Sequence, residues 1–124
     1  MKTNSINWFE IPARDMDKAV AFYEKTFAVT LKREAFGGEP HAVFPVDREA
    51  RGVTGALVSA PRLTPGAGVL IYLDAPDGVQ ATLARAKTAG AKEVAPHMSI
   101  GEFGFVAVVL DLEGNQIGLH SMTA

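Results

Sequence analysis

The sequence predicts an α+β fold of two βαβββ modules. The second half of the chain repeats the first at an offset of about 62 residues, without gaps. In each half an alternating strand leads to a helix that begins near an aspartate, and short strands with glycine turns follow. A module of about 60 residues buries too little surface to stand comfortably alone, so the two copies must share a sheet face or a core. The repeat matches Ala13 with Ala75, Asp15 with Asp77, Gly52 with Gly114 and Leu57 with Leu119.

The first module is predicted to occupy residues 1–60. Residues 6–11 alternate as a strand does, and Pro12 closes that strand. Asp15 stands where a helix N-cap belongs, and apolar residues then recur at helical spacing, so a helix is expected over residues 15–27. The remaining strands are expected at residues 29–33, 41–46 and 54–59, with a Gly37-Gly38 turn between the first two.

The second module is predicted to occupy residues 68–124, after a Pro- and Gly-containing linker over residues 61–67. A strand is expected at residues 69–73, and Asp77 is expected to cap a helix that Gly90 ends. The other strands are expected at residues 93–95, 105–110 and 116–120, with Glu113-Gly114-Asn115 turning between the last two. Residues 105–110 are apolar almost throughout, so this strand is expected to be covered on both faces.

Composition excludes several classes of function. The chain has 124 residues, 48% of them hydrophobic, which is enough for one domain with a real core. A net charge of −2 with scattered basic residues gives no footprint for nucleic acid, and no apolar run is long enough to span a membrane. Without cysteine there is no disulfide, thiolate metal site or Cys nucleophile. A cytoplasmic protein is expected, since no secretory signal opens the sequence.

Several segments together resemble one known family, the glyoxalase, bleomycin-resistance and extradiol-dioxygenase superfamily, also called the vicinal oxygen chelate superfamily. The chain is most similar to its small single-domain members related to lactoylglutathione lyase. The resemblance implies that the two modules pair into a curved, cup-like mixed sheet with the helices outside. In metal-dependent members, four His or Glu side chains line the cup floor, one from the first and one from the last strand of each module. The segments that carry the resemblance are Phe9-Glu10-Ile11-Pro12, Asp15, the Ala19-Phe22-Tyr23 helix and the closing residues 111–120.

Carried onto this sequence, the ligand positions of the family predict that no metal centre of the usual kind is present. Imidazole and carboxylate sites need at least three such donors, and these positions supply none. They hold Trp8, Ala56, Leu70 and Gly118. No cofactor is therefore expected; a divalent metal held by Glu10 and His120 would need water or a third protein ligand.

Two residues farther along the same strands, a second set of side chains is expected to face the same way, because side chains alternate with period two. These are Glu10, Val58, Tyr72 and His120. Glu10 and His120 are the candidate general base and acid, and Tyr72 can hold or polarise a substrate oxygen. Glu10 can equally be a structural edge carboxylate, and His120 a partly exposed residue at a strand end.

Further residues are predicted to contact a substrate or to remain uninvolved. Trp8, Phe44, Val58 and Phe105 are candidate substrate-binding residues, although an aromatic residue on an inner strand also serves the core. His41 and His97 are expected to be solvated, since one opens a strand and the other follows Pro96 in a loop. Residues 99–104 resemble the loop that rims the cleft in related proteins, and their glycines would permit movement over a ligand.

Three functions remain open. The first is a metal-independent enzyme of isomerase or lyase type, which moves a proton on a small carbonyl or hydroxyl compound. The second is a non-catalytic module that binds or sequesters a flat or aromatic molecule, as bleomycin-resistance members do. The third is an accessory dimer without turnover. The resemblance also implies a homodimer, and in each case the expected partner is a small molecule.

Overall fold

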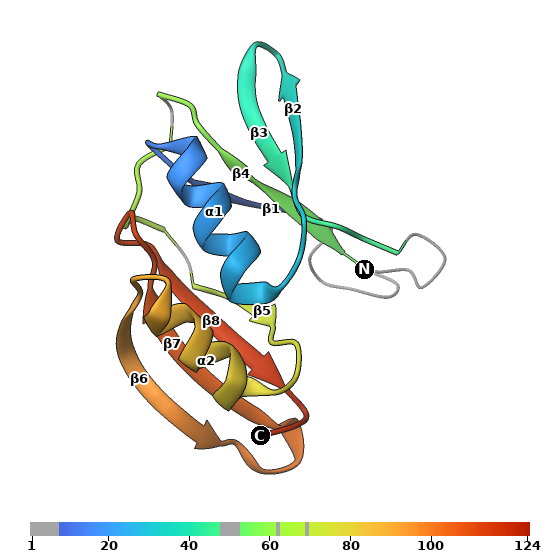
Figure 1. Cartoon of the computed structure of the whole chain (residues 1–124), viewed down its shortest axis with the longest axis vertical. Coiled ribbons are helices and arrows are strands. Elements are labelled where there is room, and N and C mark those ends of the chain that lie inside the picture. Colours follow the sequence, from blue (N-terminus) through green and yellow to red (C-terminus); the bar gives the residue numbers. More distant parts are fainter. Residues whose placement is uncertain (1–7, 48–52, 62, 69) are drawn as a thin grey trace.

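Two consecutive β-α-β-β-β units build the chain, as the computed structural model in Figure 1 shows. It describes residues 8–47, 53–61, 63–68 and 70–124. The first unit consists of β1 (Trp8–Pro12), α1 (Met16–Phe27), β2 (Lys32–Phe36), β3 (Glu39–Val43) and β4 (Thr54–Val58). The second consists of β5 (Ile71–Asp74), α2 (Val79–Thr88), β6 (Lys92–Ser99), the short 3₁₀ helix η1 (Gly101–Phe103), β7 (Phe105–Leu110) and β8 (Gln116–Ser121).

Hydrogen bonds join the described strands into two four-stranded sheets of the same topology. Their orders are β1-β4-β3-β2 and β5-β8-β7-β6. In each sheet the first strand runs parallel to the last strand of its module, and the other neighbours are antiparallel. The predicted α+β class with two βαβββ modules is therefore confirmed.

The two modules share one hydrophobic core on the helix side of their sheets. The helix α1 packs on β3 and β4, α2 packs on β6, β7 and β8, and the two helices contact each other (Figure 1). Buried residues of both units form a single cluster that includes Phe22, Tyr23 and Leu83. Arg85 of α2 strengthens the junction, because its Nε donates to the carbonyl oxygen of Thr26 in α1 at 2.8 Å. The opposite faces of the two sheets point away from this core.

The start of α1 follows the sequence prediction. Asp15 is the N-cap, and its side chain accepts a hydrogen bond from the backbone N–H of Lys18 at 3.1 Å. The predicted cap of α2 is wrong: Asp77 lies outside the helix at φ 63°, and Gly78 is the N-cap without a side-chain bond. Instead, the backbone N–H of Gln80 donates to the carbonyl oxygen of Ala124 at 2.9 Å, so residues distant in sequence complete this helix start.

Two strands of the first module lie closer to their turn than predicted. The strands β2 and β3 end and begin directly at Gly37-Gly38, where both glycines have positive φ, at 59° and 80°. Such a two-residue turn pairs the strands tightly, and Phe36 lies opposite Glu39. The strand β6 is longer than predicted, with irregular pairing to β7. The predicted strand over residues 105–110 is confirmed, and its four central residues are buried.

Candidate functional site

A cavity of about 770 Å³ lies between the two modules, within the size range of small-molecule sites. Its walls are residues 8–12 of β1, the connecting segment between positions 63 and 68, Leu70 and Ile71, and residues 115–117 at the start of β8. Trp8 brings a large aromatic surface that is 42% exposed, and Glu10 brings a carboxylate. The cavity therefore offers a flat apolar surface beside a negative charge.

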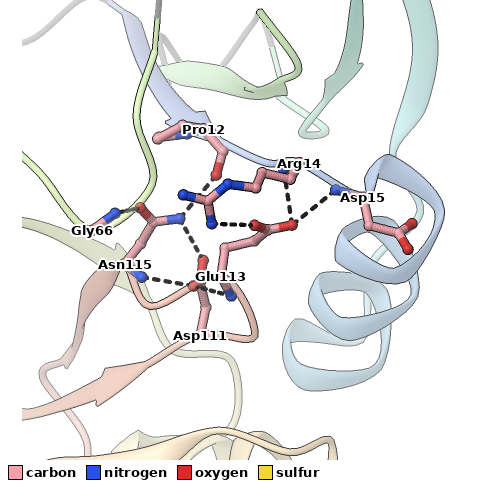
Figure 2. Close-up of polar contacts among 7 residues, drawn as sticks. All are labelled: Pro12, Arg14, Asp15, Gly66, Asp111, Glu113 and Asn115. Atoms are coloured by element: carbon pink, nitrogen blue, oxygen red, sulfur yellow. Dashed lines mark hydrogen bonds and ion pairs between the residues drawn. The ribbon is translucent and has the colours of Figure 1, made fainter. Parts of the chain in front are cut away.

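One asparagine holds the walls of this cavity together, as Figure 2 shows. The Nδ2 atom of Asn115 donates to the carbonyl oxygen of Pro12 at 2.9 Å and to Oδ2 of Asp111 at 2.9 Å. Its Oδ1 accepts from the backbone N–H of Gly66 at 2.7 Å. Asn115 thus connects β1, the connecting segment and the last turn of the second module, which fixes the relative position of the walls.

The same turn also reaches the first helix. The Oε2 atom of Glu113 accepts hydrogen bonds from the backbone N–H groups of Arg14 and Asp15, at 2.8 and 2.9 Å (Figure 2). The guanidinium group of Arg14 lies 3.6 Å from Oε1 of the same carboxylate. A carboxylate from the second module therefore binds the segment that starts α1, where a negative charge is favourable.

A buried tyrosine anchors the turn from the other side. The hydroxyl of Tyr23 donates to Oδ2 of Asp111 at 2.8 Å, and Tyr23 is almost fully buried. Burial, the negative charge of Asp111 and this hydrogen bond all raise the pKa of the Tyr23 phenol well above its ordinary value. Tyr23 therefore remains a hydrogen-bond donor, and we assign this network a structural role. The sequence predicted the turn at residues 113–115 but not these contacts.

Glu10 has a histidine partner that the sequence analysis set aside. His41 was expected to be solvated, which is wrong, because only 4% of it is exposed. Its Nε2 atom lies 3.8 Å from Oε2 of Glu10, and its Nδ1 atom lies 2.8 Å from the carbonyl oxygen of Glu39. Glu10 also accepts a long hydrogen bond from Nε1 of Trp8 at 3.4 Å. The described contacts of Glu10 thus link the cavity to a buried imidazole.

The four predicted ligand positions of the family do not fit a metal in this chain. Trp8, Ala56, Leu70 and Gly118 carry no His, Asp or Glu donor. A Cβ atom on residue 118 would collide with the ring of Tyr72, which occupies the space beside Gly118. Within the described ranges, no group of three or more His, Asp or Glu side chains is placed to hold a metal ion.

The strand register places Glu10 and Val58 at different levels of the first sheet, and Tyr72 and His120 at different levels of the second. Glu10 lies opposite Ala56, whereas Val58 lies opposite Pro12. In the second module, Tyr72 lies opposite Gly118 and His120 lies opposite Asp74. As predicted, Glu10 and Val58 share one face of the first sheet, and Tyr72 and His120 share one face of the second. The cavity lining includes Glu10 but not Tyr72 or His120.

The predicted substrate-binding residues divide between the two faces of the sheets. Trp8 and Val58 share the face of Glu10, where Trp8 is exposed and Val58 is fully buried. Phe44 packs on the opposite, helix side, with its ring 5.5 Å from that of Phe9 and 5.6 Å from that of Tyr23. Phe105 also packs against the core, and the half-buried ring of His97 stacks on it at 5.3 Å. Of these four aromatic and apolar candidates, Trp8 belongs to the cavity.

Comparison with known proteins identifies the family. Residues 5–119 match the family described as the Glyoxalase/Bleomycin resistance protein/Dioxygenase superfamily. No curated protein matches the chain when sequences are compared. Within the described parts of the chain, no helix is long and apolar enough to cross a membrane.

Solved structures place the chain among proteins of two sizes. A glyoxalase/bleomycin resistance protein from Streptomyces sp. CB03234 is 27% identical, with a TM-score of 0.65, and the match covers 92% of this chain and 97% of that one. TnmS3, an antibiotic binding protein from the same organism, is 26% identical with a TM-score of 0.65, and covers 97% of both chains. A glyoxalase I mutant from Zea mays has a TM-score of 0.71 at 16% identity, but this chain spans only 45% of its length.

Proposed function

We propose that this chain, which belongs to the Glyoxalase/Bleomycin resistance protein/Dioxygenase superfamily, binds a flat aromatic small molecule without a metal ion. The observation that carries the proposal is the inter-module cavity of about 770 Å³ with the half-exposed indole of Trp8 on its wall. A large aromatic side chain supplies a stacking surface for such a ligand. The donor-free set Trp8, Ala56, Leu70 and Gly118 supports metal-independent binding.

The similarity to small relatives supports binding rather than glyoxalase chemistry. The antibiotic binding protein TnmS3 matches this chain over nearly the whole of both lengths. The maize glyoxalase I chain is about twice as long and less identical. A small organic ligand of natural-product size is therefore the ligand class we propose.

Thermal stability in the presence of aromatic compounds tests the proposal. A ligand at 100 times its Kd adds about 2.7 kcal/mol to the stability of the native state, which raises the Tm measurably. Trp8→Ala should weaken binding of the same compound at least tenfold, measured by calorimetry. Met122→Ala is the matched control, since Met122 is 65% exposed and lies outside the cavity lining. Equal affinity in the Trp8→Ala and Met122→Ala variants would contradict the proposed site.

A second candidate function is proton transfer on the bound molecule, in the manner of an isomerase or lyase. The observation that favours it is the position of Glu10, a carboxylate that lines the cavity 3.8 Å from a buried imidazole. Such a group can act as a general base, an effect worth about 10²–10⁴ in rate; Tyr72 and His120 stay candidates for the oxygen-binding and acid roles. Glu10→Gln separates the two functions: if it abolishes a detected turnover and leaves affinity unchanged, the chain is an enzyme.

We also propose that the chain forms a homodimer. The exposed apolar residues Trp8, Phe36, Tyr72 and Met98 lie on sheet faces away from the shared core, and exposed apolar surface of this kind suits burial against a second copy. Light scattering coupled to gel filtration measures the mass directly, and a monomer at micromolar concentration contradicts the proposal. A cytoplasmic location remains a prediction.

A further inference from the structure

The imidazole of His41 is held in one orientation by its own module. Its Nδ1 atom is 2.8 Å from the carbonyl oxygen of Glu39, and the ring packs edge-on against Phe36 with centroids 4.8 Å apart. A carbonyl oxygen can only accept, so Nδ1 carries a hydrogen and donates it. In the neutral ring Nε2 is then the acceptor, and it is directed to the side on which Glu10 lies.

The distance between His41 and Glu10 leaves room for one more atom. Nε2 and Oε2 are 3.8 Å apart, which is too long for a direct hydrogen bond. An oxygen atom placed off the line between them can lie about 2.8 Å from both. A carboxylate has about four acceptor positions, so further partners of Glu10 do not prevent such a contact. Two ionisable groups thus converge on a single polar position.

We infer that Glu10 and His41 together bind a hydroxyl group on the aromatic ligand, so that the ligand class is a phenol-like compound. This inference rests on the proposed function, because the indole of Trp8 must hold the ring. The Nε1 atom of Trp8 is itself 3.4 Å from Oε2 of Glu10, which places the carboxylate beside the stacking surface. A hydroxyl both donates and accepts, so it can donate to Glu10 or to neutral His41, and can accept from protonated His41.

The apolar surroundings make this contact selective. Val58 lies opposite His41 in the sheet and is fully buried, as is its neighbour Ala56. A ligand without a hydroxyl would fill this position and return no hydrogen bond to His41, which is only 4% exposed, and leaving a buried polar group unpaired is costly. The pair therefore selects for a hydroxyl group and against the corresponding ether.

Calorimetric titration with three probes tests the inference: 2-naphthol, 2-methoxynaphthalene and naphthalene. In the wild-type chain we expect 2-naphthol to bind at least about tenfold tighter than the other two, the effect of one hydrogen bond to a charged group. In Glu10→Gln and in His41→Gln this preference should fall to less than about threefold. Met122→Ala, outside the cavity, should retain the full preference.

Because His41 is buried, its variant can fail to fold, and an NMR measurement on the wild-type protein then tests the same contact. The ¹⁵N resonance of His41 Nε2 should shift on addition of 2-naphthol and stay in place with 2-methoxynaphthalene. Equal affinities for the naphthol and the ether, or an unmoved His41 signal at saturation, would overturn the hydroxyl site while leaving aromatic binding intact. If none of the three probes binds, or if binding is insensitive to Trp8→Ala, the proposed function fails instead.

Discussion

Replacement of Asn115 by alanine should loosen the attachment between the two modules, because one buried side chain bonds three separate segments (Figure 2). Asn115 is only 6% exposed. Asn115→Ala removes the bonds to Pro12, Asp111 and Gly66 together. It leaves in place the bond that the backbone N–H of residue 115 donates to Oδ1 of Asp111 at 2.9 Å. The change therefore isolates the contribution of the side-chain amide.

The size of the effect follows from the partners of Asn115. The bonds to the Pro12 carbonyl and the Gly66 N–H join neutral groups and contribute about 1 kcal/mol each, whereas the bond to the Asp111 carboxylate contributes about 1.5–3 kcal/mol. Gly66 is exposed, so water can partly replace its lost bond. We expect the free energy of unfolding to fall by about 3 kcal/mol, which for a chain of this size lowers the Tm by about 10 °C.

Urea unfolding followed by far-UV circular dichroism measures this change, and the m-value should stay constant. Asn115→Asp keeps an acceptor for Gly66 but loses both donated bonds and places a second carboxylate beside Asp111, so it should be less stable than Asn115→Ala at neutral pH. The exposed neighbour gives a matched control, Gln116→Ala, with an expected change within about 0.5 kcal/mol. The reasoning is refuted if Asn115→Ala also stays within about 0.5 kcal/mol of the wild type.

Three further predictions concern Tyr23, Gly118 and Glu113. Tyr23→Phe keeps the ring but loses the bond to Asp111, so the free energy of unfolding should fall by about 1.5–3 kcal/mol in urea. Because the pKa of Tyr23 is raised, the native state keeps a proton that the unfolded state releases, so wild-type stability should decline above about pH 10, and Tyr23→Phe should lack this component. Gly118→Ala should lower the free energy of unfolding by about 1–3 kcal/mol, because the added Cβ collides with the ring of Tyr72. Much of that loss should disappear when the same substitution is made in Tyr72→Ala. Glu113→Gln should lower the free energy of unfolding by about 1 kcal/mol, measured in urea. The control Glu102→Gln, at an exposed position, should leave it almost unchanged.

The repeat and the helix periodicity were sufficient to predict the modules and the order of their elements. The first and last residues of the strands were harder to predict, because some backbone N–H groups form hydrogen bonds with partners outside the sheet. Leu31 is buried and apolar, as in a strand, but its backbone N–H donates to Oε2 of Glu24 in α1 at 2.9 Å. That bond replaces a ladder bond, and β2 begins only at Lys32. Local composition contains no signal for such a contact.

The start of α2 was mispredicted for a related reason. In the first module the side chain of Asp15 caps the helix by accepting from the backbone N–H of Lys18, three residues farther on, and the sequence shows such a local cap directly. In the second module the N–H of Gln80 bonds to the carbonyl of Ala124. A cap supplied by backbone from the far end of the chain has no residue-type signature, so the repeat misleadingly transferred the role of Asp15 to Asp77.

His41 is the most instructive difference at the candidate site, because a signal for its burial was present in the sequence. As the first residue of a strand over 41–46 it would lie at an open end, and a solvated side chain would follow. A Gly-Gly pair with positive φ at both positions closes a two-residue hairpin, and such a turn requires pairing to begin at the residues directly beside it. That rule pairs Phe36 with Glu39 and makes His41 the third residue of β3, opposite Glu34 on one side and Val58 on the other. Its imidazole then lies on the same sheet face as Glu10, with Nε2 3.8 Å from the Oε2 atom of that residue. The polar pair thus follows from the geometry of the turn and not from any property of the histidine itself.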